Sequence, residues 1–239
     1  MSIFLENNME RESNFKYDSE VIGKVGEKDF IKNVGHIMKQ CFKKSTLDIG
    51  WRYVDVSDDE IFQLRDIDFV LLSRNFDANV KTVNTKTKCK MIRGGFGKEI
   101  VRVEVKTDTK TYKTRNFVYE LISHYDGGCW ATTKADMIYY VCVDEENPSK
   151  IMQRYVIYPK ILRDFLMRNH QFMSHNTADI TNPDVPIVMN VVNDKYNERG
   201  ELDDPILNIL FNIDFLAKYE KIVKEIIIPN ETIYTGGGL

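Results

Sequence analysis

Two short segments of the sequence carry residue types that together could hydrolyse a phosphodiester bond. Asp68 lies in the apolar run RDIDFVLL, and Glu104 and Lys106 are two residues apart in VRVEVKTD. Side chains alternate between the two faces of a strand, so Glu104 and Lys106 project from the same face. Two carboxylates with open coordination positions suit Mg²⁺, which keeps several waters and binds phosphate oxygens. A lysine beside such an ion can orient the attacking water. The pattern therefore predicts hydrolysis that uses Mg²⁺, with Mn²⁺ as a substitute.

Asp66 is a second candidate ligand on the same predicted strand. It precedes Asp68 by two residues and would share its face, so it could replace or supplement Asp68 at the metal. We favour Asp68 because the apolar Ile67 and Phe69 on either side would hold it rigidly. The sequence leaves open which of the two aspartates is the main ligand.

This chemistry requires that the two strands lie close together, and the surrounding sequence predicts them. Residues 67–72 form a compact apolar run that is typical of a buried strand. Residues 100–106 alternate between valine and charged side chains, which predicts a half-exposed strand. Ahead of both, apolar residues at three-and-four spacing predict a helix over 21–42. Further predicted elements are strands over 51–56, 137–143 and 151–158, a helix beginning near Asn116, a helix opened by Pro159, and an amphipathic helix over 205–225.

The order of these elements indicates an α/β or α+β fold with a central mixed β-sheet flanked by helices. We expect three parts: a loose N-terminal arm over 1–19, a core over 20–169, and a C-terminal extension over 170–239 that contains the amphipathic helix as a helical appendage. The apolar residues of that helix suit either a core or an interface. The chain could therefore act alone, as a homodimer or as a subunit of a larger complex.

Composition excludes several classes of protein. With 36 acidic and 33 basic residues the net charge is -3, which excludes a uniformly basic nucleic-acid binder. No apolar run approaches the roughly 20 residues that a membrane-spanning helix needs. The first 20 residues lack the basic and apolar regions of a secretion signal. Four cysteines without CxxC spacing argue against a zinc site or a disulfide framework. We expect a cytoplasmic protein without a membrane partner; its many Lys, Asn and Ile residues fit the AT-rich genome of a bacterium or a phage.

One stretch is basic in spite of the acidic net charge. Residues 74–98 hold seven bases and a single acid, Asp77, a local charge of +6. Such a segment can neutralise phosphates by releasing counterions, although a solvated loop is the alternative interpretation. The bases that we expect to contact nucleic acid are Lys86, Lys88, Lys90, Arg93 and Lys98, in an insertion with glycines at positions 94, 95 and 97.

The sequence resembles the PD-(D/E)XK, or restriction-endonuclease-like, nuclease superfamily over roughly residues 20–169, and in particular its phage- and plasmid-type members. The resemblance rests on Asp68 in RDIDFVLL and on Glu104 and Lys106 in VRVEVKTD, with the motif proline absent. NFVYEL and GGCWATTKADMIYYV extend it. It implies a restriction-endonuclease-like core in which Asp68 and Glu104 bind the metal and Lys106 serves the attacking water.

The same resemblance implies two further site residues. Glu27, which follows Gly26 in the first predicted helix, would complete the metal site. Glu120 in NFVYEL would assist from the helix after the ExK strand.

The expected activity is therefore that of a metal-dependent DNA endonuclease, and the resemblance implies products with 5′-phosphate and 3′-hydroxyl ends. The rival interpretation is a catalytically silent protein of the same fold that binds DNA or a protein partner, as an inhibitor or a recruitment module. The presence of Asp68, Glu104 and Lys106 together favours catalysis. The sequence leaves open whether the substrate is double-stranded, single-stranded, branched or RNA. Asp136, in KADMIYY, is expected to form a structural hydrogen bond.

Overall fold

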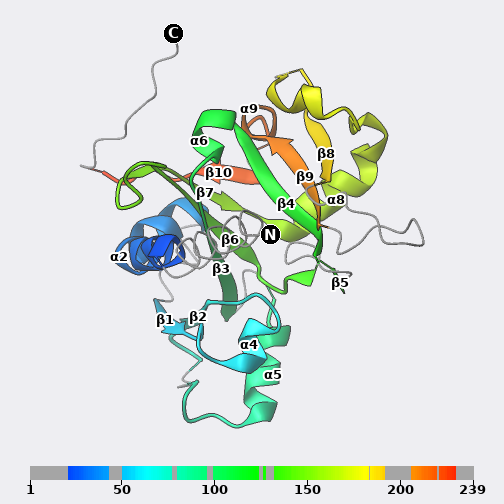
Figure 1. The fold of residues 1–239 in the computed structure, drawn as a ribbon. Helices are drawn as coiled ribbons and strands as arrows, with labels where there is room; N and C mark the ends of the chain where they lie inside the picture. Colours follow the sequence, from blue (N-terminus) through cyan, green and yellow to red (C-terminus); the bar gives the residue numbers. More distant parts are fainter. Residues whose placement is uncertain are drawn as a thin grey trace, which may run out of the picture.

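A computed structural model describes residues 21–42, 50–76, 80–95, 99–123, 126–127, 132–182, 184–191, 206–219 and 221–229 of the 239-residue chain. The predicted arm over 1–19 and Lys98 lie outside the described residues. The described residues form two β-sheets with helices packed around them (Figure 1). Among them, no helix combines the length and the apolar character needed to cross a lipid bilayer.

The larger sheet is mixed and confirms the predicted fold class. Its strand order is β1-β2-β3-β6-β7-β10, and every neighbouring pair is antiparallel except β3 and β6, which are parallel. The predicted strands over 51–56, 67–72, 100–106, 137–143 and 151–158 are all present. Their observed bounds are β1 (Trp51–Asp55), β2 (Phe69–Ser73), β3 (Ile100–Asp108), β6 (Met137–Val143) and β7 (Ile151–Ile157), and β10 (Val223–Glu225) forms the far edge.

Helix α2 (Gly23–Cys41) covers one face of this sheet and confirms the helix predicted over 21–42. Its apolar stripe, which includes Phe30 and Ile37, packs on alternate residues of β2, β3 and β6, such as Phe69, Val103 and Tyr139. This alternation arises because the side chains of a strand point to opposite faces. The neighbouring residues of β3, including Glu104 and Lys106, therefore face away from α2.

The opposite face of the sheet is covered at its two ends by different elements. Over β6 and β7 lies a cluster formed with the smaller sheet and with α8 (Pro159–Asn169), the helix that Pro159 was expected to open. Over β1 and β2 lies a second cluster formed with α4 (Glu60–Gln63) and α5 (Thr85–Arg93). Figure 1 shows α4 and α5 together at the β1–β2 end of the molecule. The middle strand β3 thus presents its polar side chains between two hydrophobic clusters.

The smaller sheet corrects two predictions of helix. Its strand order is β5-β4-β9-β8, with β4 (Asn116–Ser123), β5 (Asp126–Gly127), β8 (Ile187–Val191) and β9 (Ile206–Asn212). The segment that was expected to begin a helix near Asn116 forms strand β4 instead. A four-residue helix, α6 (Thr111–Thr114), precedes this strand. Phe117 and Tyr119 are buried two residues apart, which is the period of a strand.

The amphipathic helix predicted over 205–225 was also wrong. The segment forms β9, then α9 (Ile213–Leu216), then β10. Ile209, Leu210 and Phe211 are consecutive and all buried, and β9 pairs with β4 along one edge and with β8 along the other. A continuous apolar run of this length does not distinguish a strand from a helix by its period. The C-terminal extension is therefore not a helical appendage, and through β10 it supplies a strand to the sheet of the predicted core.

The remaining elements are short. The predicted insertion before β3 contains helix α5, which begins where the Asn84 side chain accepts a hydrogen bond from the Thr87 amide (3.0 Å) and buries Met91 against α4. Between α8 and β8 lie two 3₁₀ turns, η2 (His170–Phe172) and η3 (Thr177–Thr181).

Candidate active site

The pairing of β2 with β3 brings Asp68 and Glu104 together. Phe69, the first residue of β2, pairs with Val103, so Asp68 comes just before the strand and beside the Glu104 position of β3. The Asp68 amide donates to the Val103 carbonyl (2.9 Å), one residue out of this register, so the regular pairing ends at Phe69 while Asp68 remains bound to β3. Asp68 Oδ2 accepts a hydrogen bond from the Val105 amide (2.7 Å). The Asp68 carboxylate is therefore held against β3 by the backbone itself.

Glu104 is the most deeply buried carboxylate of the site. Only 3% of its surface is exposed, which corrects the prediction of a half-exposed strand: the two hydrophobic clusters enclose this part of β3. Its Oε1 accepts from Lys106 Nζ at 2.7 Å, whereas Oε2 is buried and has no hydrogen-bond partner among the described residues. Burial raises the pKa of Glu104 to about 7, although the Lys106 ammonium opposes this rise.

Asp66 lies in the turn before β2, not on the strand. Its backbone is left-handed, with φ of 51°, which is uncommon for a residue other than glycine. Threonines hold the turn: Thr132 Oγ1 donates to Asp66 Oδ2 (3.3 Å), and Thr133 Oγ1 donates to the Asp66 carbonyl (3.2 Å). Burial raises the pKa of Asp66, whereas the charge of Lys106 lowers it. The charge of Asp66 therefore acts on the site. Asp66 does so from a turn, and not, as was predicted, from the strand face that carries Asp68.

Burial is also the main cause of the raised pKa of Asp68. The Val105 hydrogen bond and the Lys106 charge oppose the rise, and the negative charges of Asp66 and Asp55 add to it. The charges of Asp66 and Asp55 therefore make the ionisation of Asp68 harder.

Glu27, on α2, is within electrostatic range of Asp68 and Asp55, whereas Glu104 and Lys106 face away from this helix. Burial, followed by the charges of Asp68 and Asp55, raises the pKa of its carboxyl group. The close packing of α2 on β3 explains this approach. A Cβ atom placed on Gly26 would lie 2.2 Å from Thr107 Oγ1 and 3.0 Å from Val105 Cγ1, so the helix meets the strand where only glycine fits.

A buried ion pair fixes α2 on the sheet. Asp29, on the helix, accepts from Arg154 Nε at 2.8 Å and from Arg154 Nη2 at 2.9 Å, and both side chains are at most 5% exposed. The Tyr139 hydroxyl donates to Asp29 Oδ2 (2.6 Å), and the Asn33 amide donates to Asp29 Oδ1 (2.9 Å). Because a buried charge without its partners is costly, this network specifies one position of α2, and hence of Glu27.

Glu120 lies on strand β4 instead of the helix that the resemblance implied. It pairs with Asn208 next to a bulge in the β4–β9 ladder, and it is half-buried. Its negative charge contributes to the raised pKa of Asp66. Glu120 therefore approaches the site from the side of Asp66.

Asp55 is the residue of this group that the sequence analysis did not single out. It ends β1 opposite Phe69, and its charge raises the pKa of both Asp68 and Glu27. Its Oδ1 accepts from the Ser57 hydroxyl (2.7 Å) and amide (3.1 Å). The sequence could have indicated Asp55, because pairing the predicted strand over 51–56 with the strand that follows places Asp55 near Asp68.

The donors present fit a hard cation such as Mg²⁺. They are carboxylate oxygens, which this ion prefers, and no described residue donates a hydrogen bond to the buried Glu104 Oε2. The carboxylates that raise one another's pKa would each be relieved by a nearby positive charge. Within the described ranges, no three Asp, Glu, His or Cys side chains form a preassembled metal-binding group.

The predicted nucleic-acid contacts have different surroundings. Lys88 is tied to Asp59 by an ion pair of 2.5 Å, and Lys90 Nζ lies 5.7 Å from the centre of the Phe76 ring. Lys86 and Arg93 are exposed on α5, at the β1–β2 end of the molecule.

Asp136 has the structural role that was expected. Its carboxylate accepts from Arg102 through Nη2 (2.5 Å), Nε (2.8 Å) and the backbone amide (2.9 Å), which ties the start of β6 to β3. The prediction is confirmed.

Comparisons with known proteins returned no match, either to a protein-family model, to a curated protein or to a solved structure.

Proposed function

We propose that the chain is a member of the PD-(D/E)XK nucleases and acts as a Mg²⁺-dependent DNA endonuclease. The observation that carries the proposal is that the Val105 amide (2.7 Å) holds the Asp68 carboxylate on β3 beside Glu104, with Lys106 Nζ 2.7 Å from Glu104 Oε1. The order of an N-terminal helix, an aspartate before one strand and ExK on the next supports it. The strand β4 in place of the helix expected after ExK departs from the resemblance.

Each side chain has a distinct part in this proposal. Asp68 and Glu104 would hold the cation, and Glu27 would approach from α2 as a third carboxylate. Lys106, which is about one-third exposed, would orient the attacking water from a position fixed by Glu104. When bound, Mg²⁺ would supply Lewis-acid stabilisation of the charge that develops on the scissile phosphate.

DNA is the proposed partner because phosphodiester hydrolysis needs a polyanionic substrate, and the exposed bases on α5 suit one. The proposal includes a cytoplasmic location, where Mg²⁺ and nucleic acid are both present.

The test is cleavage of supercoiled, linear duplex and single-stranded circular DNA by the purified protein with Mg²⁺ or Mn²⁺. We expect cutting that EDTA abolishes and that Lys106→Ala reduces by about 10²–10³-fold, the effect typical of removing one preorganised charge from an active site. The matched control is Lys113→Ala, which removes a lysine that is also paired with a glutamate (Glu145, 3.0 Å) but lies on the surface. This control should leave the cleavage rate unchanged.

Binding of Mn²⁺, followed by electron paramagnetic resonance, gives a readout that does not depend on turnover. Glu104→Gln should weaken this binding. Cutting that survives Lys106→Ala would show that the site is wrongly assigned or that a contaminant is active. A protein that binds DNA but neither cuts it nor binds Mn²⁺ would be the catalytically silent relative.

A further inference from the structure

Helix α8 borders three hollows that adjoin one another. The first, of about 330 Å³, is lined by Thr133, Ile161 and Arg163 among others, and it shares Ile161 with the second, of about 700 Å³. The second shares Phe165 and Asn169 with the third, of about 530 Å³. We call these three hollows together the α8 groove.

The first two hollows of the α8 groove are strongly basic, although the chain as a whole has a net charge of -3. Arg102 is paired with Asp136, so these two charges cancel. None of the ion pairs found in the described part of the chain involves the lysines and arginines at 160, 168, 218 and 221. The charged residues lining the two hollows are Arg102, Lys134, Lys160, Arg163, Arg168, Lys218 and Lys221, seven bases, against the two acids Asp136 and Asp164.

Aromatic rings form the floor between these bases. The rings of Phe165, Phe215 and Tyr219 lie in mutual contact, with centroids 5.7 to 6.1 Å apart. Tyr219 is 45% exposed, so part of a rigidly packed ring faces solvent. Lys218 Nζ lies 5.8 Å from the centre of the Phe215 ring. Exposed aromatic rings can stack nucleobases, and the lysines and arginines around them can bind the phosphates between those nucleobases.

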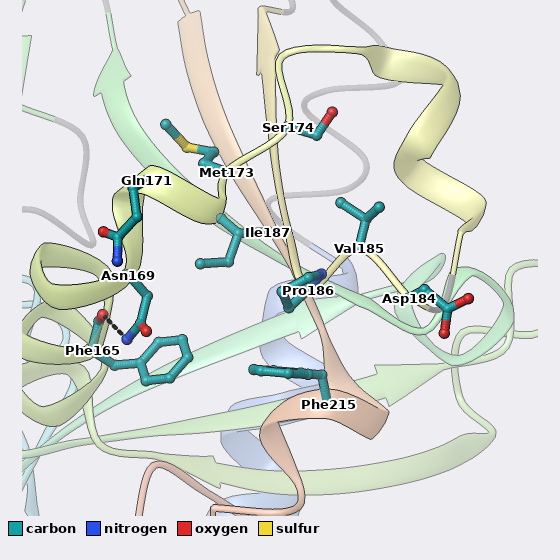
Figure 2. A pocket seen from close by; sticks show the side chains of 10 residues that line it. All are labelled: Phe165, Asn169, Gln171, Met173, Ser174, Asp184, Val185, Pro186, Ile187 and Phe215. Atoms are coloured by element: carbon teal, nitrogen blue, oxygen red, sulfur yellow. Dashed lines mark hydrogen bonds between the residues drawn. The ribbon is translucent and has the colours of Figure 1, made fainter.

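The third hollow continues this surface with an apolar pocket (Figure 2). Phe165 and Phe215 lie beside Pro186 and Ile187, and the side-chain amides of Asn169 and Gln171 stand at one edge. Asn169 Nδ2 donates to the Phe165 carbonyl (2.8 Å), and its side-chain oxygen accepts no hydrogen bond from another described residue, so it can accept one from a ligand. An apolar wall with a few amide groups at its rim suits a planar heterocycle.

The near end of the α8 groove adjoins the candidate active site. Arg163 Nη1 donates to the Thr133 carbonyl (3.4 Å). Thr133 in turn holds the Asp66 turn through its hydroxyl, and Asp66 is electrostatically coupled to Lys106. A strand that leaves the candidate site past Asp66 would therefore enter the groove beside Arg163.

We propose that the α8 groove binds a single-stranded nucleic acid. Its phosphates would contact the lysines and arginines at the rim, and its nucleobases would stack on Tyr219 and enter the apolar pocket. Single strands are favoured over duplexes because a duplex hides the faces of its bases, which the aromatic floor would contact. This inference rests on the proposed function, since it adds the substrate class: a nucleic acid with a single-stranded portion next to the scissile phosphate.

The test measures fluorescence anisotropy of a labelled 20-nucleotide oligo(dT), and of a duplex of equal length, with the full chain in EDTA. We expect the single strand to bind more tightly than the duplex. Tyr219→Ala should weaken single-strand binding about fivefold or more, which corresponds to the loss of one stacked base. The double variant Arg168→Glu with Lys221→Glu should weaken it further and reduce its salt dependence, because phosphate contacts are lost. The control is Lys39→Glu, an exposed lysine on α2, which covers the other face of the sheet; it should change nothing.

Groove variants that bind the single strand like Lys39→Glu, while keeping their melting temperature, would overturn the inference. So would equal binding of duplex and single strand, or equally tight binding of poly-glutamate, which would indicate a surface for an acidic protein. Because this assay needs no cleavage, groove-dependent binding without metal-dependent cutting would refute only the proposed function. Cutting that is indifferent to the groove variants would refute only this inference.

Discussion

At the scale of single residues, Glu104 is the side chain whose environment conflicts most with its charge. It is 3% exposed, Lys106 binds one of its oxygens, and the other has no hydrogen-bond partner within the described ranges. Such a carboxylate is stable when it is protonated or when a cation lies beside it, and costly otherwise. The raised pKa therefore couples the stability of the protein to pH and to metal.

We predict that the metal-free protein loses stability as the pH rises from 4.5 to 7. The folded-state pKa of Glu104, about 7, lies above the ordinary value of 4.5, so this stabilisation is complete below pH 4.5 and is lost as the pH passes through 7. The loss is on the order of 3 kcal/mol. Urea unfolding in EDTA over this range measures it, and Glu104→Gln should remove most of the slope.

The control for this prediction is Glu99→Gln, which changes an exposed glutamate one residue before β3. It should leave the pH dependence as in the original protein. If Glu104→Gln has the same slope as the original protein, Glu104 does not carry the linkage. Mg²⁺ should raise the melting temperature more at pH 8 than at pH 5, because the ionised carboxylates are its ligands.

At the scale of elements, the contact between α2 and β3 determines where Glu27 lies. Gly26 allows the helix to approach Thr107 and Val105, and the Asp29–Arg154 ion pair fixes its position on the sheet. Gly35, in the same helix, is exposed and has nothing within 4 Å of the position that a Cβ would take. Packing against β3 therefore requires glycine at position 26, whereas position 35 has room for a larger side chain.

Gly26→Ala and Gly35→Ala should have opposite effects on stability. Gly26→Ala forces α2 away from β3 and should lower the free energy of unfolding by about 1–3 kcal/mol, the usual cost of overpacking. Gly35→Ala should raise it by about 0.4–1 kcal/mol, because alanine restricts the unfolded chain and favours the helix. Chemical denaturation measures both. Only Gly26→Ala should also reduce cleavage, since it displaces Glu27; equal effects from the two would refute this account.

At the scale of the whole molecule, residues beyond 205 complete two hydrophobic clusters. Ile209, Phe211 and Leu216 are buried with β6, β7 and α8, whereas Ile226 and Ile228 pack on the α2 side of the sheet. β10 also closes the β7 edge of the larger sheet. The predicted core over 20–169 therefore shares its interior with the C-terminal extension.

We predict that a fragment over 20–169 does not unfold cooperatively on its own. Without the extension, apolar residues of β7 and α8 such as Ile157 and Leu162 would be exposed to water. Thermal unfolding by circular dichroism and the dispersion of NMR resonances measure this, with the full chain as the reference. Co-expression of 170–239 should restore a cooperative transition. A lone fragment that melts at the temperature of the full chain would show that the core is independent.

Much of the local structure followed from the sequence. The helix over 21–42, the strands over 51–56, 67–72, 100–106, 137–143 and 151–158, and the helix opened by Pro159 were all predicted with bounds within a few residues. These segments have a clear period or a proline at a helix start, which are local signals. The common face of Glu104 and Lys106 was also determined locally, because strand alternation allows no other arrangement.

Only the tertiary structure decided the rest, because contacts between distant segments override or complete the local signal. The apolar run of β9 became a strand since β4 and β8 lie on either side of it. Glu104 became buried because α8, the smaller sheet and the α4–α5 cluster enclose β3, which no pattern within 100–106 records. Asp55 joined the site through its pairing with β2, and Asp66 through a turn held by threonines 66 or more positions away. The sequence by itself determined which side chains share a face of a strand, and long-range packing determined which of them are buried together.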